Sequence, residues 1–191
     1  MKKKIILLTV PILLFVAILY GFIPYYEKYK NIQRYAFTMD SADGKFSLSD
    51  LKNRYAIIYF GYMSCPDICP TTLSFISQAL NRLKKRDAKK FQLIFISVDP
   101  DRDTLKGIKE YVRFFSPNAI GLTSNKKYLK KVTSNYGTYY AKEYQKGSKL
   151  DYSVAHTSFV YIMDTDGLLI KKLPHLEDSN QIYKVLLSLS K

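Results

Sequence analysis

The chain has 191 residues, enough for one ordinary domain and a short additional segment, so two folded domains are not expected. Hydrophobic residues make up 47% of the chain and aromatic residues 15%, which excludes a disordered tail and a fibrous repeat protein. The formal net charge of +14 is scattered along the chain and no zinc-finger or RNA-binding motif accompanies it, so we expect no nucleic-acid partner.

The N-terminus carries a long apolar segment. Residues 5–23 form a run of 19 residues without a charge, long enough as a helix to cross a hydrocarbon core of roughly 30 Å. Lys2, Lys3 and Lys4 precede it, which by the positive-inside tendency keeps the N-terminus in the cytoplasm. The run is longer than a signal-peptide core and no small-residue cleavage site follows it, so we expect a retained anchor.

This segment sets the expected organisation of the chain. No Arg-rich, Ser-rich presequence precedes the apolar run, which favours a bacterial inner membrane over an organelle import route. We therefore expect a single-pass protein whose folded domain lies on the periplasmic side. The expected segments are a basic cytoplasmic start over 1–4, a transmembrane anchor over 5–23, a juxtamembrane linker over 24–34 and the folded domain over 35–191.

The first half of that domain is predicted as a hairpin followed by a strand–helix–strand unit. The hairpin has strands over 37–39 and 46–48 around the turn Asp43-Gly44. Residues 55–60 and 91–98 are near-continuous apolar runs, typical of strands buried on both faces of a sheet. Between them, apolar residues recur at spacings of three and four, which predicts a helix from Pro70 onwards.

The second half is predicted to alternate helices with a hairpin. The expected elements are a helix through Phe115 capped by Asp103 or Thr104, a helix through Asn135 capped by Ser124 and stopped by Gly137, a hairpin of strands 157–163 and 168–173, and a last helix opened by Asp178. This order predicts the α/β class: a thioredoxin-like sandwich with an added N-terminal β-hairpin, preceded by one transmembrane helix.

The two cysteines, Cys65 and Cys69, follow the first buried strand and precede a helix. Two cysteines so close together cannot form a disulfide framework, and they lie where open α/β sheets place functional groups. Backbone N–H groups at the start of a helix favour thiolate over thiol. Thiolates can exchange with disulfides or hold a soft metal ion such as Cu(I), and the three-residue spacer, wider than that of C-x-x-C, favours the metal. A buried, inert pair remains the alternative.

A metal site needs a third ligand, and the chain has two histidines, His156 and His175. His156 immediately precedes a predicted core strand, so we expect it in a loop that faces the cysteines; His175 follows the distal end of a hairpin. Two thiolates and an imidazole make a three-ligand soft site, whereas Zn(II) normally takes a fourth ligand. For each histidine a purely structural role remains the alternative.

Three motifs together resemble one family. They are FGYMSCPDICP at 60–70, SVDPDRDT at 97–104 and DYSVAHT at 151–157. In this order they resemble the Sco/SenC family of membrane-anchored thioredoxin-fold copper proteins, from about Phe37 to the C-terminus. The resemblance implies a copper metallochaperone that delivers copper to, or matures, the binuclear copper centre of cytochrome c oxidase, with Cys65, Cys69 and His156 as copper ligands. It implies the copper-centre subunit of that oxidase as a partner, and another copper chaperone as a further one.

A second function stays open at this point. A membrane-anchored thiol–disulfide reductase would use Cys65 to attack and Cys69 to resolve, and it would not need the His156 imidazole. The chain has no Trp, so a Trp-Cys-Gly-Pro-Cys redox site is absent. Ala155 stands where the family usually has Asp, which changes a charge beside the site but none of the three ligands. Asp99 is expected either at the rim of the site or as a cap of its own loop.

Overall fold

The structure, a computed structural model, describes residues 2–144, 151–174 and 178–191; the side chains of residues 2–17 are outside this description. The chain divides into two compact units, Met1–Arg34 and Tyr35–Lys191. Among the described residues, no helix combines the length and the apolar character needed to cross a membrane. The transmembrane helix predicted over 5–23 is thus not supported by the described part of the chain, and most of its residues have side chains outside that description.

The second unit contains strands and helices in alternation, whereas the first consists of one helix. The strands are β1 (Thr38–Ser41), β2 (Gly44–Ser47), β3 (Tyr55–Gly61), β4 (Phe91–Ser97), β5 (Ile120–Leu122), β6 (Tyr140–Tyr144), β7 (Tyr152–His156), β8 (Val160–Met163) and β9 (Leu169–Leu173). The helices are α1 (Lys2–Tyr35), the 3-10 helix η1 (Leu48–Asp50), α2 (Ile68–Arg82), α3 (Lys85–Ala88), α4 (Leu105–Phe115), α5 (Lys126–Asn135) and α6 (Ser179–Leu189).

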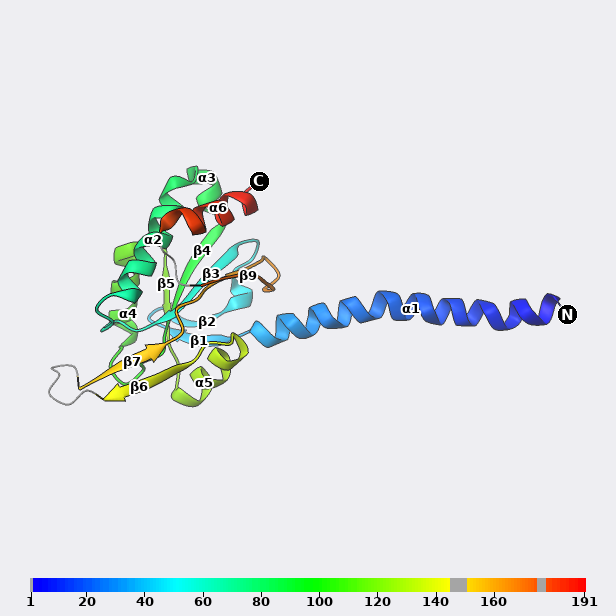
Figure 1. Ribbon diagram of the computed structural model, residues 1–191, viewed down its shortest axis with the longest axis horizontal. Helices are drawn as coiled ribbons and strands as arrows, with labels where there is room; N and C mark the ends of the chain where they lie inside the picture. Colours follow the sequence, from blue (N-terminus) through cyan, green and yellow to red (C-terminus); the bar gives the residue numbers. More distant parts are fainter. Residues whose placement is uncertain (1, 145–150, 175–177) are drawn as a thin grey trace. The chain divides into compact units, whose positions relative to one another are not determined.

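A five-stranded sheet in the order β5-β4-β3-β8-β9 forms the centre of the second unit (Figure 1). β3, β4 and β5 are parallel to one another, while β8 is antiparallel to β3 and β9 is antiparallel to β8. Every residue of β4 is buried, as are all residues of β3 except Tyr55, which explains their nearly continuous apolar sequences. The predicted α/β class is confirmed.

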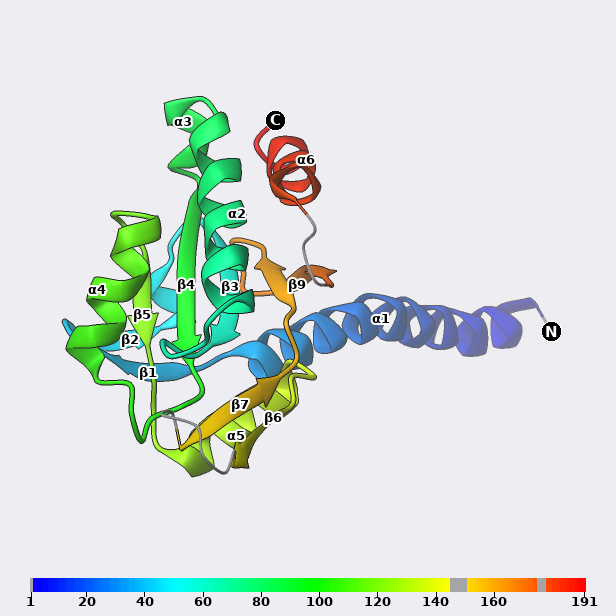
Figure 2. The ribbon, with the colours of Figure 1, turned by 60° about the vertical axis from the view of Figure 1, so that its left-hand side comes forward.

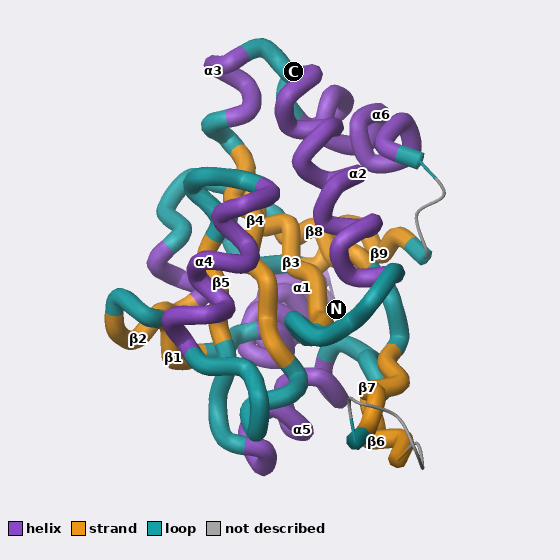
Figure 3. The backbone as a smooth tube through the Cα atoms, turned by 90° about the vertical axis from the view of Figure 1, so that its left-hand side faces the viewer, coloured by secondary structure: helices purple, strands orange, loops and turns teal. Residues whose placement is uncertain are grey.

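Helices cover both faces of this sheet. Tyr59 and Gly61 of β3 point to the face packed by α2 and α4, where Phe95 also contacts Tyr111 with ring centroids 5.6 Å apart. Phe60 points to the opposite face, where its ring lies 5.3 Å from that of Tyr136 just beyond α5. α2 and α6 are in contact and lie side by side (Figures 2 and 3). The core is therefore built on two sides of β3 and β4.

Several predicted boundaries shift by a few residues, for identifiable reasons. α2 begins at Ile68 rather than at Pro70, because a proline in the first turn lacks only an N–H that has no helical partner there. Thr104 caps α4, as predicted, by accepting from the backbone N–H of Gly107 at 3.1 Å. The predicted cap of α5, Ser124, is wrong: Asn125 is the cap and accepts from the N–H of Tyr128 at 3.0 Å.

Three strands were not predicted from the sequence. β5 has only three residues, and Gly121 within it lets α4 approach so closely that a Cβ there would lie 2.5 Å from Ile108. β6 and β7 form a separate antiparallel hairpin beside the end of the sheet toward which β4 points (Figure 2). The strand predicted over 157–163 begins only at Val160. His156, predicted to lie in a loop, is therefore the last residue of a strand.

Candidate metal centre

The two cysteines lie beyond the carboxyl end of β3, where the chain turns into α2. Cys65 is half-buried in the connecting loop, whereas Cys69 lies in the first turn of α2 and has no exposed surface. The backbone N–H of Cys69 points at Cys65 Sγ, with 3.4 Å between the two atoms. This contact holds the loop before α2 so that the two sulfurs lie close together.

His156 approaches the cysteines from β7, where it is paired with Tyr140 of β6. Its Nε2 lies 3.3 Å from Cys69 Sγ, and its Nδ1 lies 3.4 Å from the carbonyl oxygen of Thr157. Because a carbonyl oxygen can only accept a hydrogen bond, an N–H at Nδ1 would donate to Thr157 and hold the ring with Nε2 toward the sulfur. A metal-binding imidazole is held in the same way, by a hydrogen bond from its other nitrogen.

The donor atoms of Cys65, Cys69 and His156 all lie within 4.8 Å of one another. Two metal–sulfur bonds of about 2.3 Å span at most about 4.6 Å, so one ion can reach all three donors after small side-chain movements. Two thiolates and an imidazole form a soft donor set that suits Cu(I). Within the described ranges of the chain, this is the one group of three or more His, Cys, Asp or Glu side chains with such a geometry.

The pKa values of the two thiols are shifted in opposite directions from that of an ordinary cysteine. The neighbouring Cys69 thiol, with smaller contributions from His156 and backbone N–H groups, lowers the pKa of Cys65 to about 3. The hydrogen bond to Cys65 and then burial raise the pKa of Cys69 far above its ordinary value. The metal-free pair therefore carries one thiolate, on the more exposed cysteine, and one proton, on the buried cysteine. A metal ion that binds both sulfurs must displace that proton.

Aromatic rings and one glycine shape the inner wall of the site. The rings of Tyr59 and Tyr62 lie 6.2 and 5.9 Å from the His156 ring, at interplanar angles of 68° and 87°. This edge-on packing restricts rotation of the imidazole. A Cβ at Gly61 would lie only 2.9 Å from Cys69 Sγ, so the last residue of β3 leaves the space that the sulfur occupies.

The loop between β4 and α4 fixes the position of the cysteine loop. Asp103 lies in this loop and is 4% exposed, and its Oδ2 accepts from the backbone N–H of Met63 at 3.0 Å and from Ser97 Oγ at 2.6 Å. Met63 is two residues before Cys65 in the same loop. Burial raises the pKa of Asp103, against the two hydrogen bonds that favour its charged form. Asp103 thus ties the chain just ahead of Cys65 to the end of β4.

The same β4–α4 loop fixes the histidine-bearing strand. Asp99 is fully buried; its carboxylate accepts from the Tyr152 hydroxyl at 2.8 Å and from Arg102 Nε at 2.6 Å. Arg102 also donates to the Tyr152 carbonyl oxygen at 3.0 Å, and its guanidinium lies 3.7 Å from the centre of the Tyr152 ring. Tyr152 begins β7 and His156 ends it. Asp99 therefore does not line the rim of the site; it anchors the strand that carries the imidazole.

All three predicted ligands are brought together, and the supporting residues were not predicted. Asp99 and Asp103 belong to the SVDPDRDT motif, but the motif alone does not indicate these contacts. Tyr152 belongs to the motif around His156. Tyr152 and Val154 are buried and the residue between them is not, and this alternation of apolar and polar residues is a strand pattern that the sequence already contains. His175, the other histidine considered as a ligand, lies outside the described residues.

Comparison with known proteins identifies one matching family. A family model described as SCO1/SenC matches residues 26–191. The SCO2-like protein of Rickettsia conorii is 38% identical over 126 residues, which are 66% of this chain and 61% of that protein. The chain thus spans about three fifths of the length of the curated relatives that it matches first.

Solved structures give the same relationship at the level of the fold. The crystal structure of Arabidopsis thaliana ScoI with copper bound superposes with a TM-score of 0.74 at 33% identity, covering 81% of this chain and 96% of that one. The thioredoxin domain of a thiol-disulfide oxidoreductase from Bacteroides vulgatus superposes with a TM-score of 0.57 at 16% identity, covering 82% of this chain and 94% of that one, which bears on the fold alone. The predicted thioredoxin-like fold is confirmed.

Proposed function

Because this chain belongs to the SCO1/SenC family, we propose that it is a copper-binding metallochaperone in which Cys65, Cys69 and His156 hold the metal ion. The observation that carries the proposal is the convergence of two sulfurs and one imidazole nitrogen within 4.8 Å. The copper-bound relative from Arabidopsis supports the choice of metal. Copper is the cargo of such a protein, so it must be held firmly and also released.

The unequal exposure of the two sulfurs suits transfer by ligand exchange. Cys69 has no exposed surface, whereas Cys65 is half-buried and its low pKa keeps it a thiolate. A thiolate of a partner protein can reach a metal ion from the Cys65 side and form a bond to it before the bond to Cys69 breaks. As that last bond breaks, Cys69 can take back a proton, which favours release. The direction of transfer then follows the relative affinities of the two proteins.

The proposed acceptor is the copper-centre subunit of cytochrome c oxidase, and another copper chaperone is a proposed donor. Family membership supports this choice. The net charge of +14 would speed the encounter with an acidic partner and would make the rate sensitive to salt. A thiol–disulfide reductase is not favoured, because dithiol exchange does not need the imidazole that His156 places beside the two sulfurs.

The proposed location is a bacterial inner membrane, with the second unit on the periplasmic side. The uncharged run over 5–23 and the three lysines before it support this proposal. Membranes washed at alkaline pH are expected to retain the full chain, and external protease added to spheroplasts is expected to digest residues 35–191. Release of the chain by the alkaline wash, or protection from the protease, would contradict the proposed location.

The ligand assignment is tested by anaerobic Cu(I) titration of the full chain in an uncharged detergent, against a competing chelator. We expect one tight equivalent that Cys65→Ser or Cys69→Ser abolishes and His156→Ala strongly weakens. His175→Ala, which changes the other histidine, is the matched control and should bind as the unmodified chain does. Unchanged affinity in any of the three ligand variants would contradict the assignment.

Transfer is tested separately, by mixing the copper-loaded chain with the purified copper-free domain of the oxidase subunit. We expect copper to move to that domain and to produce its binuclear centre. In a parallel mixture, the metal-free chain is added to the same domain with its cysteines oxidised. If copper is not transferred in the first mixture and the cysteines of the domain become reduced in the second, the reductase function replaces the metallochaperone function.

A further inference from the structure

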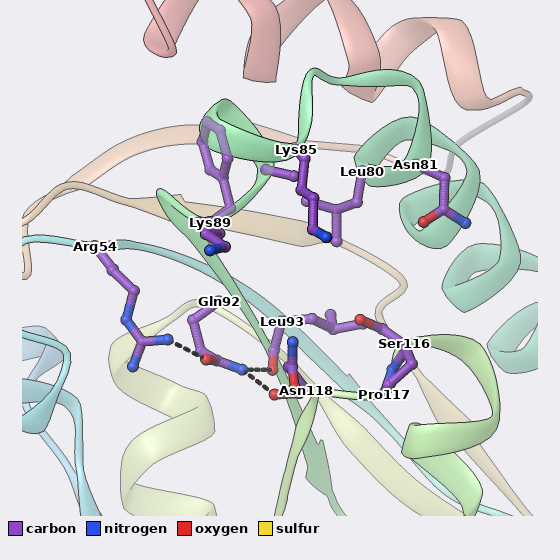
Figure 4. Close-up of a pocket in the computed structure, with 12 residues that line it drawn as sticks. Arg54, Leu80, Asn81, Lys85, Lys89, Gln92, Leu93, Ser116, Pro117 and Asn118 are labelled. Carbon is purple, nitrogen blue, oxygen red and sulfur yellow. Dashed lines mark hydrogen bonds between the residues drawn. The ribbon is translucent and has the colours of Figure 1, made fainter.

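A cationic cavity lies at the end of the sheet opposite the cysteines. It has a volume of about 500 Å³ and lies among the start of β4, the end of α2, α3 and the segment before β5. Three of its lining residues, Arg54, Lys85 and Lys89, are cationic, and no Asp or Glu lines it. In Figure 4 the two lysine side chains extend from α3 toward Gln92 and Leu93, and Arg54 lies across from them.

The two lysines lie one helical turn apart, with no ion-pair partner among the described residues. Lys85 begins α3 and Lys89 caps its end in helical conformation, so their charges repel one another at the i,i+4 spacing. The acidic residue of this turn, Asp87, faces other cations: it lies 3.6 Å from Arg86 and 3.3 Å from Lys90. The repulsion between Lys85 and Lys89 is therefore uncompensated, and an anion placed between them would relieve it.

The Arg54 guanidinium is held by one hydrogen bond and has further N–H donors. Its Nη1 donates to Gln92 Oε1 at 2.7 Å. Gln92 is 4% exposed, and its amide donates to the backbone carbonyl oxygens of Leu93 and Asn118 at 3.1 and 2.6 Å, which fixes its orientation. A guanidinium has five N–H groups, and within the described residues this is the one hydrogen bond found for the Arg54 side chain. The others remain for a ligand.

From this arrangement we infer that the cavity binds a phosphate-bearing ligand. Three cations match a multiply charged group better than a single carboxylate, and the planar fork of Arg54 suits phosphate oxygens. Part of the lining is apolar, with Leu80, Leu93 and Pro117 beside the charged groups (Figure 4). This lining admits either a soluble phosphate compound or the phosphate headgroup of a lipid with part of its chains. The cavity shares no lining residue with the metal centre, so the inference does not depend on the proposed copper function.

The test is calorimetric titration of the metal-free full chain, in an uncharged detergent at low salt, with two probes. One is inorganic pyrophosphate, and the other is dibutyryl phosphatidic acid, whose chains are too short to form membranes. Lys85→Gln/Lys89→Gln is expected to raise the Kd about tenfold, the order expected for the loss of two partly exposed charge contacts. Lys127→Gln/Lys131→Gln, the matched control on α5, removes the same charge from exposed lysines outside the cavity and should leave the Kd unchanged.

The relative affinity of the two probes distinguishes the sources of the ligand. Tighter binding of pyrophosphate indicates a soluble phosphate compound, and tighter binding of the lipid analogue indicates a headgroup whose chains lie along the apolar wall. The inference is overturned if neither probe binds, or if the two double variants weaken binding equally, because the interaction would then follow net charge alone. An unchanged thermal midpoint in both double variants shows that the fold is intact.

Discussion

The space that Gly61 leaves for Cys69 Sγ makes Gly61→Ala a direct test of the packing inside the metal centre. A Cβ at this position would lie 2.9 Å from Cys69 Sγ, 2.9 Å from Cε2 of Phe95 and 3.3 Å from Cε1 of Tyr59. Non-bonded carbon atoms pack best at about 3.5–4.0 Å, so at least two of these neighbours must move by half an ångström or more. All three neighbours are buried, and none can turn outward to solvent.

The expected cost follows from this overlap. One methyl group forced into a well-packed core costs about 1–3 kcal/mol, and we expect Gly61→Ala to lower the free energy of unfolding by that amount. The displaced Cys69 sulfur should also weaken Cu(I) binding by about tenfold, the low end of the range for residues that orient metal ligands. Urea unfolding of the reduced, metal-free chain gives the first quantity and chelator competition gives the second.

Gly21→Ala is the control, because nothing lies within 4 Å of the Cβ added there. It should leave both quantities unchanged. If Gly61→Ala unfolds within about 0.5 kcal/mol of the unmodified chain and binds Cu(I) equally well, then Cys69 is not confined by β3 and the described geometry of the site is incorrect.

Three further predictions concern the supports of the site and the chemistry of its thiols. Tyr152→Phe removes the hydroxyl that donates to buried Asp99 and should lower the free energy of unfolding in urea by about 1.5–3 kcal/mol. Tyr144→Phe, at a ring that is 77% exposed, should leave it unchanged. Equal effects of the two substitutions would refute the anchoring of β7. The pKa of Cys65 lies below its ordinary value and that of Cys69 lies above it, so iodoacetamide should alkylate Cys65 first in the metal-free chain. The alkylation rate should be nearly constant between about pH 6 and 8. A rate that rises about tenfold per pH unit, as for an ordinary thiol, would disprove the assignment. Asn125→Ala should lower stability by about 1 kcal/mol through loss of the α5 cap, and Ser124→Ala should not; the reverse result would restore the cap predicted from the sequence.

The parts of the fold that the sequence predicted are those with a strong local signal. β3 and β4 are long apolar runs, and Thr104 caps α4 with its side chain, so neighbouring residues alone identify them. β6 was missed because its sequence, YAKEY, is half-exposed and polar, and it forms a strand only by pairing with β7. Its partner decides its structure, and that partner, β7, was itself not predicted from the sequence.

In the candidate site, the ligands have a local sequence signal and the residues that support them do not. The cysteine spacing and the position of His156 before a core strand were sufficient to select the three candidate ligands that the structure brings together. The residues that hold them, Asp99 and Asp103, could not be assigned, because their contacts join the β4–α4 loop to β7 and to the cysteine loop. Such contacts depend on the tertiary fold, and a sequence motif indicates only that the residues matter.

The most direct test of the central claim is X-ray absorption spectroscopy of the Cu(I)-loaded full chain, with His156→Ala and His175→Ala beside it. We predict two sulfur neighbours and one nitrogen neighbour for copper in the unmodified chain and in His175→Ala, and loss of the nitrogen neighbour in His156→Ala alone. A copper environment that is the same in all three proteins, or one without two sulfur neighbours, would contradict a site built from Cys65, Cys69 and His156.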